Sequence, residues 1–349
     1  MKALIVMPRS RRITPERLAS SRAGFMRVLI TGAGGFIGRT LTSALLQAGA
    51  LTNTAGTSET IEELLLLDTH LPPASDRRVR HLQADIDVPD TLKKIAAWKP
   101  HSVFHLAAVL TSAAEQDSTR ALAVNVSALA ELIDAIGTKD APPRLIFPSS
   151  IAVFGGLLPD HVDDDHLQRP QTSYGTHKAI AELMLADATR HGMVDARALR
   201  LPIVLVHPGP PTQSVSDRIA GIVRDGVAGK PSICPLRADT KVPIVSVETV
   251  AQNLITLHNA DPAKMRGKRA LNQPALTISM DDIIESIARV TNTTPNVTYA
   301  LDPDLKKIVD SWPKGFISTR APSLGVVADK SFEDIVSQYR QRLAEKSAA

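Results

Sequence analysis

Between residues 26 and 206 the chain alternates short apolar runs with segments of helical periodicity. The runs predict strands at residues 28–30, 64–67, 79–83, 103–106, 145–147 and 198–206. The segments between them predict helices at residues 37–48, 93–98, 121–136 and 174–189. Because continuous apolar strands alternate with helices, we expect an α/β fold with a doubly wound parallel sheet that helices cover on both faces.

The alternation breaks down after residue 206. Residues 207–211 (HPGPP) predict a loop, and the helices and short strands beyond them predict a smaller α/β lobe over residues 207–349. A helix over residues 248–258 is expected to return to the main body. The first domain therefore comprises residues 26–206, with 244–260 returning to it.

The first 25 residues stand apart from this pattern. They hold five arginines against one acidic residue, Glu16, and their apolar stretch is too short for a secretory signal. We interpret residues 1–25 as an extension ahead of a domain that begins at Met26. The same composition is also typical of an organellar transit peptide, and that alternative stays open.

Composition narrows the functional classes. Hydrophobic residues make up 44% of the chain and charged residues 22%, which is typical of a globular protein, whereas aromatic residues, at 3%, are too few for a nucleic-acid stacking platform. The 40 basic and 36 acidic side chains form no dense basic stripe. No apolar run approaches the ~18 residues that span a bilayer, and the single cysteine, Cys234, excludes an intrachain disulfide. We expect a soluble, cytoplasmic protein that binds neither nucleic acid nor a membrane.

A glycine-rich turn, residues 32–38 (GAGGFIG), connects the first predicted strand to the first predicted helix. Gly32 permits the tight turn, Gly35 lets backbone N–H groups approach a pyrophosphate, and Gly38 lets the helix pack closely on the sheet. The helix start offers the positive end of its dipole to the phosphate charge. The turn therefore predicts a dinucleotide-binding site, and the alternative is a generic glycine-rich turn.

Two carboxylates follow the next two predicted strands. Asp68 is placed to accept hydrogen bonds from an adenosine ribose diol, and its charge would repel a 2′-phosphate, which favours NAD over NADP. It lies 36 residues (68 − 32) after Gly32 instead of the usual ~20. A loop at residues 52–56 is expected to absorb the excess. Asp85 is a candidate adenine contact, or alternatively a turn or helix-capping aspartate.

A tyrosine and a lysine form a candidate catalytic pair. Tyr174 and Lys178 are four residues apart in a predicted helix, so they lie on one face of it. An ammonium near a phenol stabilises the phenolate, and we expect the pair to lower the pKa of Tyr174 from ~10 toward neutrality, where the phenol can act as a general base. Ser150 ends the preceding strand, at the sheet edge where ligands bind. Neither of the other two tyrosines has a lysine four residues on.

Several motifs resemble the extended short-chain dehydrogenases/reductases, the NAD-dependent epimerase/dehydratase group. They are the glycine turn, residues 105–108 (HLAA), Asn125, residues 149–155 (SSIAVFG), Tyr174 with Lys178, and residues 200–202 (RLP). The resemblance implies a Rossmann-type sheet, a C-terminal substrate lobe and a homodimer. It also implies Tyr174 as the base, Lys178 bound to the nicotinamide ribose, and Ser150 orienting the substrate.

The cofactor implied is NAD. The residues that we expect to contact it are Gly32, Gly35, Phe36, Ile37, Gly38, Asp68, Asp85, Ile86, Leu106, Ala107, Ala108, Asn125, Tyr174, Lys178 and Pro202.

Within this group, a more specific resemblance, to the D-erythronate dehydrogenases, rests on residues 104–117 (FHLAAVLTSAAEQD), 147–159 (FPSSIAVFGGLLP), 172–178 and 200–209. This implies NAD-dependent oxidation of the secondary alcohol of a small sugar acid, D-erythronate to 2-oxo-tetronate. The acid's carboxylate needs a cation or several donors, for which Arg218 and Lys241 are candidates, although each is also typical of a solvated surface charge. Thr111 and Ser112 are candidate partners of substrate hydroxyls, or alternatively N-caps of the next helix.

Two other groups receive no catalytic role. Residues 161–166 (HVDDDH) contain metal-ligand types, but we interpret them as a solvated or lid-like acidic loop and expect no metal. His105 is interpreted as a hydrogen-bonded structural histidine.

Two further functions stay open beside acid oxidation. One is a nucleotide-sugar epimerase or dehydratase that retains its NAD. The other is a nucleotide-sensing protein with an inactive site, against which the complete set of Ser150, Tyr174 and Lys178 argues.

Overall fold

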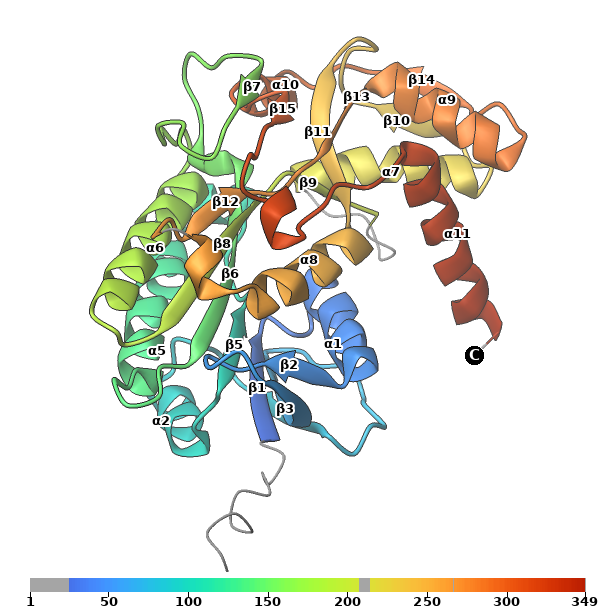
Figure 1. The fold of residues 1–349 in the computed structure, drawn as a ribbon. Helices are drawn as coiled ribbons and strands as arrows, with labels where there is room; N and C mark the ends of the chain where they lie inside the picture. Colours follow the sequence, from blue (N-terminus) through green and yellow to red (C-terminus); the bar gives the residue numbers. More distant parts are fainter. Residues whose placement is uncertain (1–24, 207–213, 266, 349) are drawn as a thin grey trace, which may run out of the picture.

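The computed structural model describes residues 25–206, 214–265 and 267–348 (Figure 1). Seven parallel strands form most of its main sheet: β1 (Phe25–Thr31), β3 (Ser58–Asp68), β4 (Val79–Gln83), β5 (Ser102–His105), β6 (Arg144–Ser150), β8 (Asp195–Leu201) and β12 (Ala270–Asn272). Their spatial order is β4-β3-β1-β5-β6-β8-β12, which confirms the doubly wound sheet. The order reverses between β1 and β5, and a crevice forms at such a reversal, outside the carboxyl ends of the strands.

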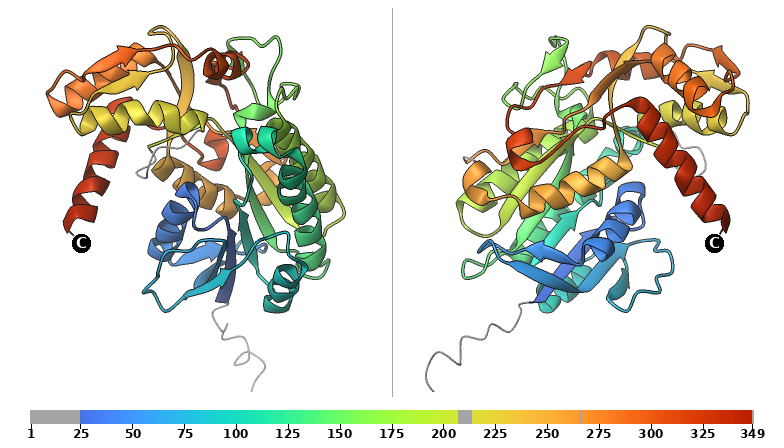
Figure 2. Two further views of the ribbon diagram at one scale, coloured as in Figure 1. Left: turned by 180° about the vertical axis from the view of Figure 1, so that it is seen from behind. Right: turned by 45° about the vertical axis from the view of Figure 1, so that its right-hand side comes forward.

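Helices cover both faces of this sheet, as Figures 1 and 2 show. One face carries α1 (Phe36–Ala48) and α8 (Val247–Asn259), and the other carries α2 (Pro89–Trp98), α5 (Ala128–Ile136) and α6 (Ser173–Arg190). Successive side chains of a strand point to opposite faces. Val28 and Ile30 accordingly belong to the core beneath α1 and α8, and Leu29 belongs to the core beneath the other helices. Burial on both faces explains the apolar runs of central strands such as β1 and β6, whereas the edge strand β4 is largely exposed.

The additional residues between Gly32 and Asp68 form a β-hairpin and not only the expected loop. The short strand β2 (Ala50–Thr52) pairs antiparallel with the first residues of β3. Asn53 closes the turn, because its Oδ1 accepts hydrogen bonds from the backbone N–H groups of Ala55 and Thr57.

The helix predicted over residues 121–136 is divided. It comprises α4 (Ser118–Leu122), a π-helical turn (Ala123–Ser127) and α5. π-helical turns are frequent at functional sites, and this one carries Asn125.

The strand predicted over residues 198–206 is two strands in different sheets. β8 ends at Leu201, and β9 (Ile203–Leu205) belongs to a separate sheet. Pro202 separates them, and because proline has no N–H group it cannot continue a ladder of hydrogen bonds.

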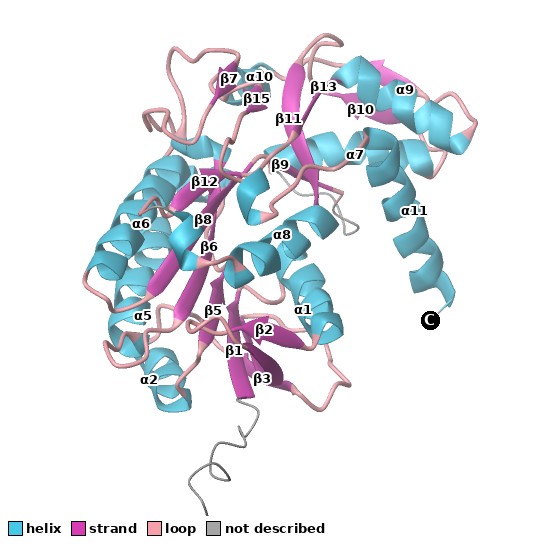
Figure 3. Ribbon diagram, viewed as in Figure 1, coloured by secondary structure: helices cyan, strands magenta, loops and turns pink. Residues whose placement is uncertain are grey.

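The C-terminal lobe is built on that separate sheet (Figure 3). β9 pairs in parallel with β11 (Lys241–Ser246), which pairs antiparallel with β13 (Leu276–Ser279). The remaining elements of the lobe are α7 (Val215–Val227), β10 (Ser232–Cys234), α9 (Met280–Thr291), β14 (Val297–Tyr299), α10 (Pro303–Asp310) and α11 (Phe332–Ala348). Between β9 and β13 the chain returns to the main body, where it forms α8 and β12.

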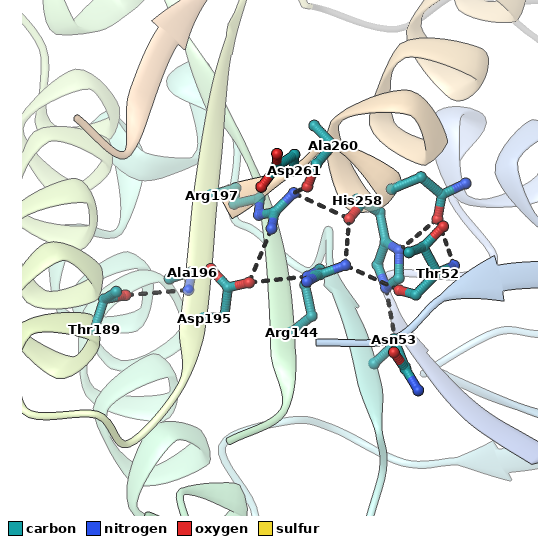
Figure 4. A network of polar contacts seen from close by, with 12 residues as sticks. Thr52, Asn53, Arg144, Thr189, Asp195, Ala196, Arg197, His258, Ala260 and Asp261 are labelled. Carbon is teal, nitrogen blue, oxygen red and sulfur yellow. Dashed lines mark hydrogen bonds and ion pairs between the residues drawn. The ribbon is translucent and has the colours of Figure 1, made fainter. Parts of the chain in front are cut away.

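A buried polar network fastens α8 to the amino ends of the main-sheet strands (Figure 4). Arg144 Nη1 donates hydrogen bonds to the carbonyl oxygens of His258 (2.7 Å) and Thr52 (2.9 Å). Arg197 Nη1 also donates to the His258 carbonyl, and Asp195 bridges the two guanidinium groups at 3.0 and 2.9 Å. Because the last carbonyls of a helix have no intrahelical partners, these cations complete the C-terminal end of α8.

The proposed N-terminal extension lies outside the described residues except for Phe25, which begins β1. Within the described ranges, no helix combines the length and the apolar character needed to cross a membrane.

Candidate active site

A cavity of about 820 Å³ lies at the carboxyl ends of the main-sheet strands, where the C-terminal lobe meets them. All of the cofactor and substrate contacts that the sequence predicted line it, with the exception of Asn125, Arg218 and Lys241. The structure therefore brings the glycine turn, the ribose-binding candidate Asp68, and the Ser150, Tyr174 and Lys178 side chains to one site.

The glycine turn is shaped by the close approach of β5. Gly32 has a φ of +70°, and a Cβ atom on it would lie 2.6 Å from the backbone nitrogen of Ala107. Gly35 precedes α1 and has no side chain with which to cap it. The positive end of the α1 dipole thus faces the cavity without an intervening side chain, which suits the pyrophosphate of a dinucleotide.

Asp68 is held rigidly at the cavity. Its Oδ2 accepts a hydrogen bond of 2.9 Å from the backbone N–H of Gly34, and its Oδ1 accepts one of 3.2 Å from that of His70. The carboxylate thereby connects the end of β3 to the glycine turn, where a dinucleotide ribose is expected.

Asp85, the candidate adenine contact, lines the cavity and has a charged partner. Arg120, on α4, forms ion pairs with both Asp85 and Asp87. Sequence reasoning missed Arg120, because nothing in its local sequence indicates that a helix brings it beside the end of β4.

A close helix packing places Tyr174 next to Ser150. Ser150 ends β6, and its Oγ accepts a hydrogen bond of 3.1 Å from the N–H of Ala152. A Cβ atom at Gly175 would lie 2.0 Å from the carbonyl oxygen of Ala152, so only glycine lets α6 approach this turn. Tyr174 precedes that glycine, and its hydroxyl is hydrogen-bonded to Ser150.

The electrostatics of the phenol differ from the prediction. Burial raises the pKa of Tyr174 to about 12, and the hydrogen bond with Ser150 opposes this only in part. Burial also lowers the pKa of Lys178 to about 7, against the opposite effect of the Glu182 carboxylate. The expected lowering of the phenol pKa toward neutrality is therefore not a property of the polypeptide alone, because the desolvation of the phenolate outweighs the hydrogen bond that favours it.

A buried polar cluster behind the catalytic residues escaped sequence reasoning. Glu182 lies one helical turn after Lys178 and accepts hydrogen bonds from Ser149 Oγ (2.5 Å) and Gln168 Nε2 (2.6 Å). Arg200 Nη2 binds the same carboxylate at 2.8 Å. The cluster connects α6 to the ends of β6 and β8, and it thereby fixes the backbone that carries Ser150.

Asn125 acts behind the cavity wall and not in it. Its side-chain amide accepts a hydrogen bond from the N–H of Val109 (2.8 Å) and donates one to the Val109 carbonyl oxygen (2.9 Å). This pairing holds the segment after β5, whose residues line the cavity. Asn125 therefore supports that segment, and its contact with the cofactor stays a prediction.

The structure does not bring either predicted carboxylate-binding cation to the cavity. Arg218, on α7, forms an ion pair with Asp302 at 2.7 Å. Lys241 is an exposed residue at the start of β11. Hydroxyl groups line the cavity instead, from Thr111 and Ser112. Neither of these caps a helix, because α3 (Thr111–Gln116) begins at Thr111 and its N-cap position is Leu110.

His105 and the acidic loop at residues 161–166, to which the sequence analysis gave no catalytic role, both have hydrogen-bond partners in the fold. His105 is buried, its Nδ1 lies 2.9 Å from Thr31 Oγ1, and burial lowers its pKa to about 3, which agrees with a neutral structural histidine. In the loop at residues 161–166, Asp164 is buried and not solvated as predicted. It accepts hydrogen bonds from the N–H of Asn272 in β12 (2.6 Å) and from Ser318 Oγ (2.9 Å), so it fastens the loop both to the main sheet and to the lobe.

The C-terminal lobe contributes lining residues that the sequence did not reveal. Ser214 to Asp217, at the start of α7, and Trp312, after α10, belong to the lining. The Ser214 side chain caps α7 by accepting from the N–H of Asp217, and this S-x-x-D pattern was the available sequence signal. No comparable signal marks Trp312.

A dinucleotide-binding turn and a phenol beside an ammonium meet in the same cavity. A nicotinamide cofactor held at the glycine turn would have a proton-transfer partner in the same cavity, and this combination is typical of an oxidoreductase that transfers hydride. The chain belongs to the NAD dependent epimerase/dehydratase family, whose model matches residues 28–268, and its cofactor is NAD.

Two curated relatives and one solved structure show which members of this family the chain resembles. The chain is 36% identical over 319 residues to the D-erythronate dehydrogenase of Cupriavidus necator, and the match covers 90% of this chain and 98% of the relative. The D-erythronate dehydrogenase of Haemophilus influenzae is 30% identical over 90% of this chain and 98% of its own length. Among solved structures, the nucleoside-diphosphate-sugar epimerase from Agrobacterium tumefaciens is similar with a TM-score of 0.83 and 31% identity, over 91% of this chain and 95% of that one. The protein is thus an NAD-dependent oxidoreductase of the epimerase/dehydratase family.

Proposed function

We propose that this enzyme oxidises the secondary alcohol of a small sugar acid, D-erythronate, to 2-oxo-tetronate with NAD as the hydride acceptor. The observation that carries the proposal is the 36% identity to a D-erythronate dehydrogenase over nearly the whole of both chains. The complete set of Ser150, Tyr174 and Lys178 at one cavity supports it, because proton removal from an alcohol needs a positioned base.

In the proposed reaction the chain positions the alcohol and accepts its proton. NAD, when bound, supplies the hydride acceptor and a positive charge beside the phenol. Ser150 and Tyr174, already joined by a hydrogen bond, hold the alcohol oxygen between them, and Tyr174 Oη takes the proton. Ser150 Oγ stabilises the oxygen as negative charge develops on it. The ammonium of Lys178 favours the phenolate electrostatically.

The polar groups that line the cavity support a small hydroxylated acid as the substrate. Hydroxyl groups of Thr111, Ser112 and Ser216 line the cavity and can donate to a carboxylate or to substrate hydroxyls.

The second candidate is nucleotide-sugar epimerisation with a retained NAD. The similarity to the Agrobacterium tumefaciens structure, titled a nucleoside-diphosphate-sugar epimerase, favours it. The two candidates differ in the fate of the reduced cofactor, because an epimerase reoxidises it within each cycle and a dehydrogenase releases it.

A substrate panel tests the proposal. Hydroxy acids of three to six carbons are supplied with NAD or NADP, and the absorbance of the reduced cofactor is followed. We expect the highest kcat/KM with D-erythronate and NAD. Failure across all four-carbon acids, together with turnover of a UDP-sugar by enzyme that retains its NAD, would establish the second candidate instead.

We also propose that the enzyme is a homodimer. Exposed leucines on two neighbouring helices support this: Leu122 on α4 is 46% exposed and Leu183 on α6 is 69% exposed. Light scattering coupled to size-exclusion chromatography should give twice the chain mass, and a mass of one chain would contradict the proposal.

A further inference from the structure

Trp312 brings the C-terminal lobe to the catalytic end of the cavity. It lies between α10 and the two-residue strand β15 (Gly315–Phe316), and it lines the cavity together with Ser150, Ile151 and Tyr174. Among the described lining residues it is the only aromatic side chain that the lobe contributes. Phe36, by comparison, belongs to α1 beside the glycine turn.

The indole is wedged between two hydrophobic cores. It packs against the core of the lobe, which includes Leu305 and Val309. It also packs against the cluster of Ile151, Phe154 and Phe316, which lies beneath the turn that follows Ser150. Because the ring is packed on two sides, it has little freedom to move, and we expect it to form a rigid part of the cavity wall.

The backbone around Trp312 is fastened to the loop that follows the catalytic serine. β15 pairs in parallel with β7 (His161–Val162), and the N–H of Gly315 donates a hydrogen bond of 3.0 Å to the carbonyl oxygen of Asp160. A Cβ atom at Gly315 would lie 2.6 Å from His161 Cδ2, so the strands approach as closely as a glycine permits. Lys314 adds an ion pair with Asp160 at 2.6 Å. These contacts hold the backbone next to Trp312 against the loop after Ser150.

We propose that Trp312 is a specificity-determining residue that sets the largest acid the site accepts. This inference rests on the proposed oxidation of a small sugar acid. A substrate whose alcohol is held by Ser150 and Tyr174 extends away from the nicotinamide, and the indole limits the carbon chain on that side. Longer acids are excluded because they would have to displace a ring packed between two cores.

Chain-length selectivity tests this assignment. The ratio of kcat/KM for a six-carbon hydroxy acid to kcat/KM for D-erythronate is measured for the wild type, Trp312→Leu and Trp312→Ala. We expect the ratio to rise about 10-fold or more in both variants, since one methylene in an apolar pocket is worth about 10- to 200-fold. Trp98→Phe is the matched control, because Trp98 is the only other tryptophan and donates to Glu63 outside the cavity.

The outcomes separate this inference from the proposed function. Oxidation of D-erythronate with an unchanged ratio in both Trp312 variants would overturn the assignment of Trp312 alone. A wild-type enzyme that oxidises no acid would overturn the proposed function and this inference with it. Thermal unfolding of each variant, beside Trp312→Phe, shows whether the lobe is intact, because the removal of a packed ring can destabilise its core.

A binding measurement gives a readout without turnover. In Trp98→Phe the only tryptophan is Trp312, so all tryptophan fluorescence originates at the proposed wall. We expect D-erythronate added to this variant with NADH bound to change the emission, and we expect no acid-dependent change in Trp312→Phe. An unchanged emission from Trp312 at acid concentrations that saturate the enzyme would contradict its place beside the substrate.

Discussion

Lys178 Nζ donates a hydrogen bond of 2.8 Å to the carbonyl oxygen of Pro148, on the strand that ends in Ser150. The same nitrogen lies 4.2 Å from the ring centroid of Phe147 and 5.7 Å from that of Tyr174. The ammonium is therefore held between the strand and the phenol. Its pKa of about 7 reflects burial, opposed by the charge of Glu182. We therefore expect the activity to depend on the protonation of this lysine.

Substituting Glu182→Gln should shift the pH profile of kcat/KM. Removal of the carboxylate lowers the pKa of Lys178 further, and the Arg200 cation left behind acts in the same direction. Activity that needs the ammonium is lost as pH rises through its pKa, so the alkaline limb should move to lower pH. Glu182→Asp, which keeps the charge, should move it less. An alkaline limb at unchanged or higher pH in Glu182→Gln would refute the electrostatic role.

Substituting Tyr174→Phe should reduce kcat by about 10²- to 10⁴-fold, which is the usual contribution of a general base. NAD affinity should change little, because the glycine turn and Asp68 are untouched. Initial-rate kinetics and titration with NADH measure the two effects. Tyr339→Phe, a buried tyrosine of the lobe core, is the control and should remain active. A Tyr174→Phe enzyme with wild-type kcat would remove the phenol from the mechanism.

Substituting Asp68→Ser should weaken NAD binding and relax the discrimination against NADP. The loss of hydrogen bonds between a charged group and the ribose costs about 1.5–3 kcal/mol, which is about 10- to 150-fold in affinity. The repulsion of a 2′-phosphate disappears with the carboxylate. Kd values for NADH and NADPH measure both changes, with Asp90→Asn on the exposed end of α2 as a control. Unaltered cofactor preference would mean that Asp68 does not contact the ribose.

Acid should destabilise the fold below about pH 6.5, the usual pKa of histidine. Burial lowers the pKa of both His105 and His258 to about 3, so the unfolded chain takes up these protons first as pH falls. The stability that each neutral imidazole contributes is complete above about pH 6.5, and below it falls by about 1.4 kcal/mol per pH unit for each histidine.

Denaturant unfolding at a series of pH values measures this slope. His258→Gln removes one of the two titrating groups and should make the slope shallower, even if the variant is less stable at neutral pH. A free energy of unfolding that stays constant between about pH 6.5 and about pH 5 would contradict the buried neutral state of these histidines.

The sequence predicted the parts of the structure that depend on local pattern. The strand before Gly32, the helix after it and the four-residue spacing of Tyr174 and Lys178 are all local, and the structure has each of them. β12 and β9 were not resolved as separate strands, because three residues are too few to establish a period.

The sequence could not predict the features that depend on contacts between residues far apart in the chain. The pairing of Arg218 with Asp302, 84 residues further on (302 − 218), is such a feature, because no local periodicity indicates it. Trp312 reaches the cavity because β15 pairs with β7, a contact between two-residue strands far apart in sequence. The pKa of Tyr174 likewise follows from the packing of α6 on the turn after β6, because burial is a property of the assembled fold.

The stoichiometry of cofactor reduction tests the central claim most directly. Purified enzyme is supplied with a limiting amount of D-erythronate and an excess of NAD, and the NADH released into solution is measured at completion, with Tyr174→Phe in parallel. The account predicts one NADH for each molecule of acid consumed, and almost none from the variant over the same time. Consumption of the acid without release of NADH, or no consumption at all by an enzyme that has bound NAD, would contradict it.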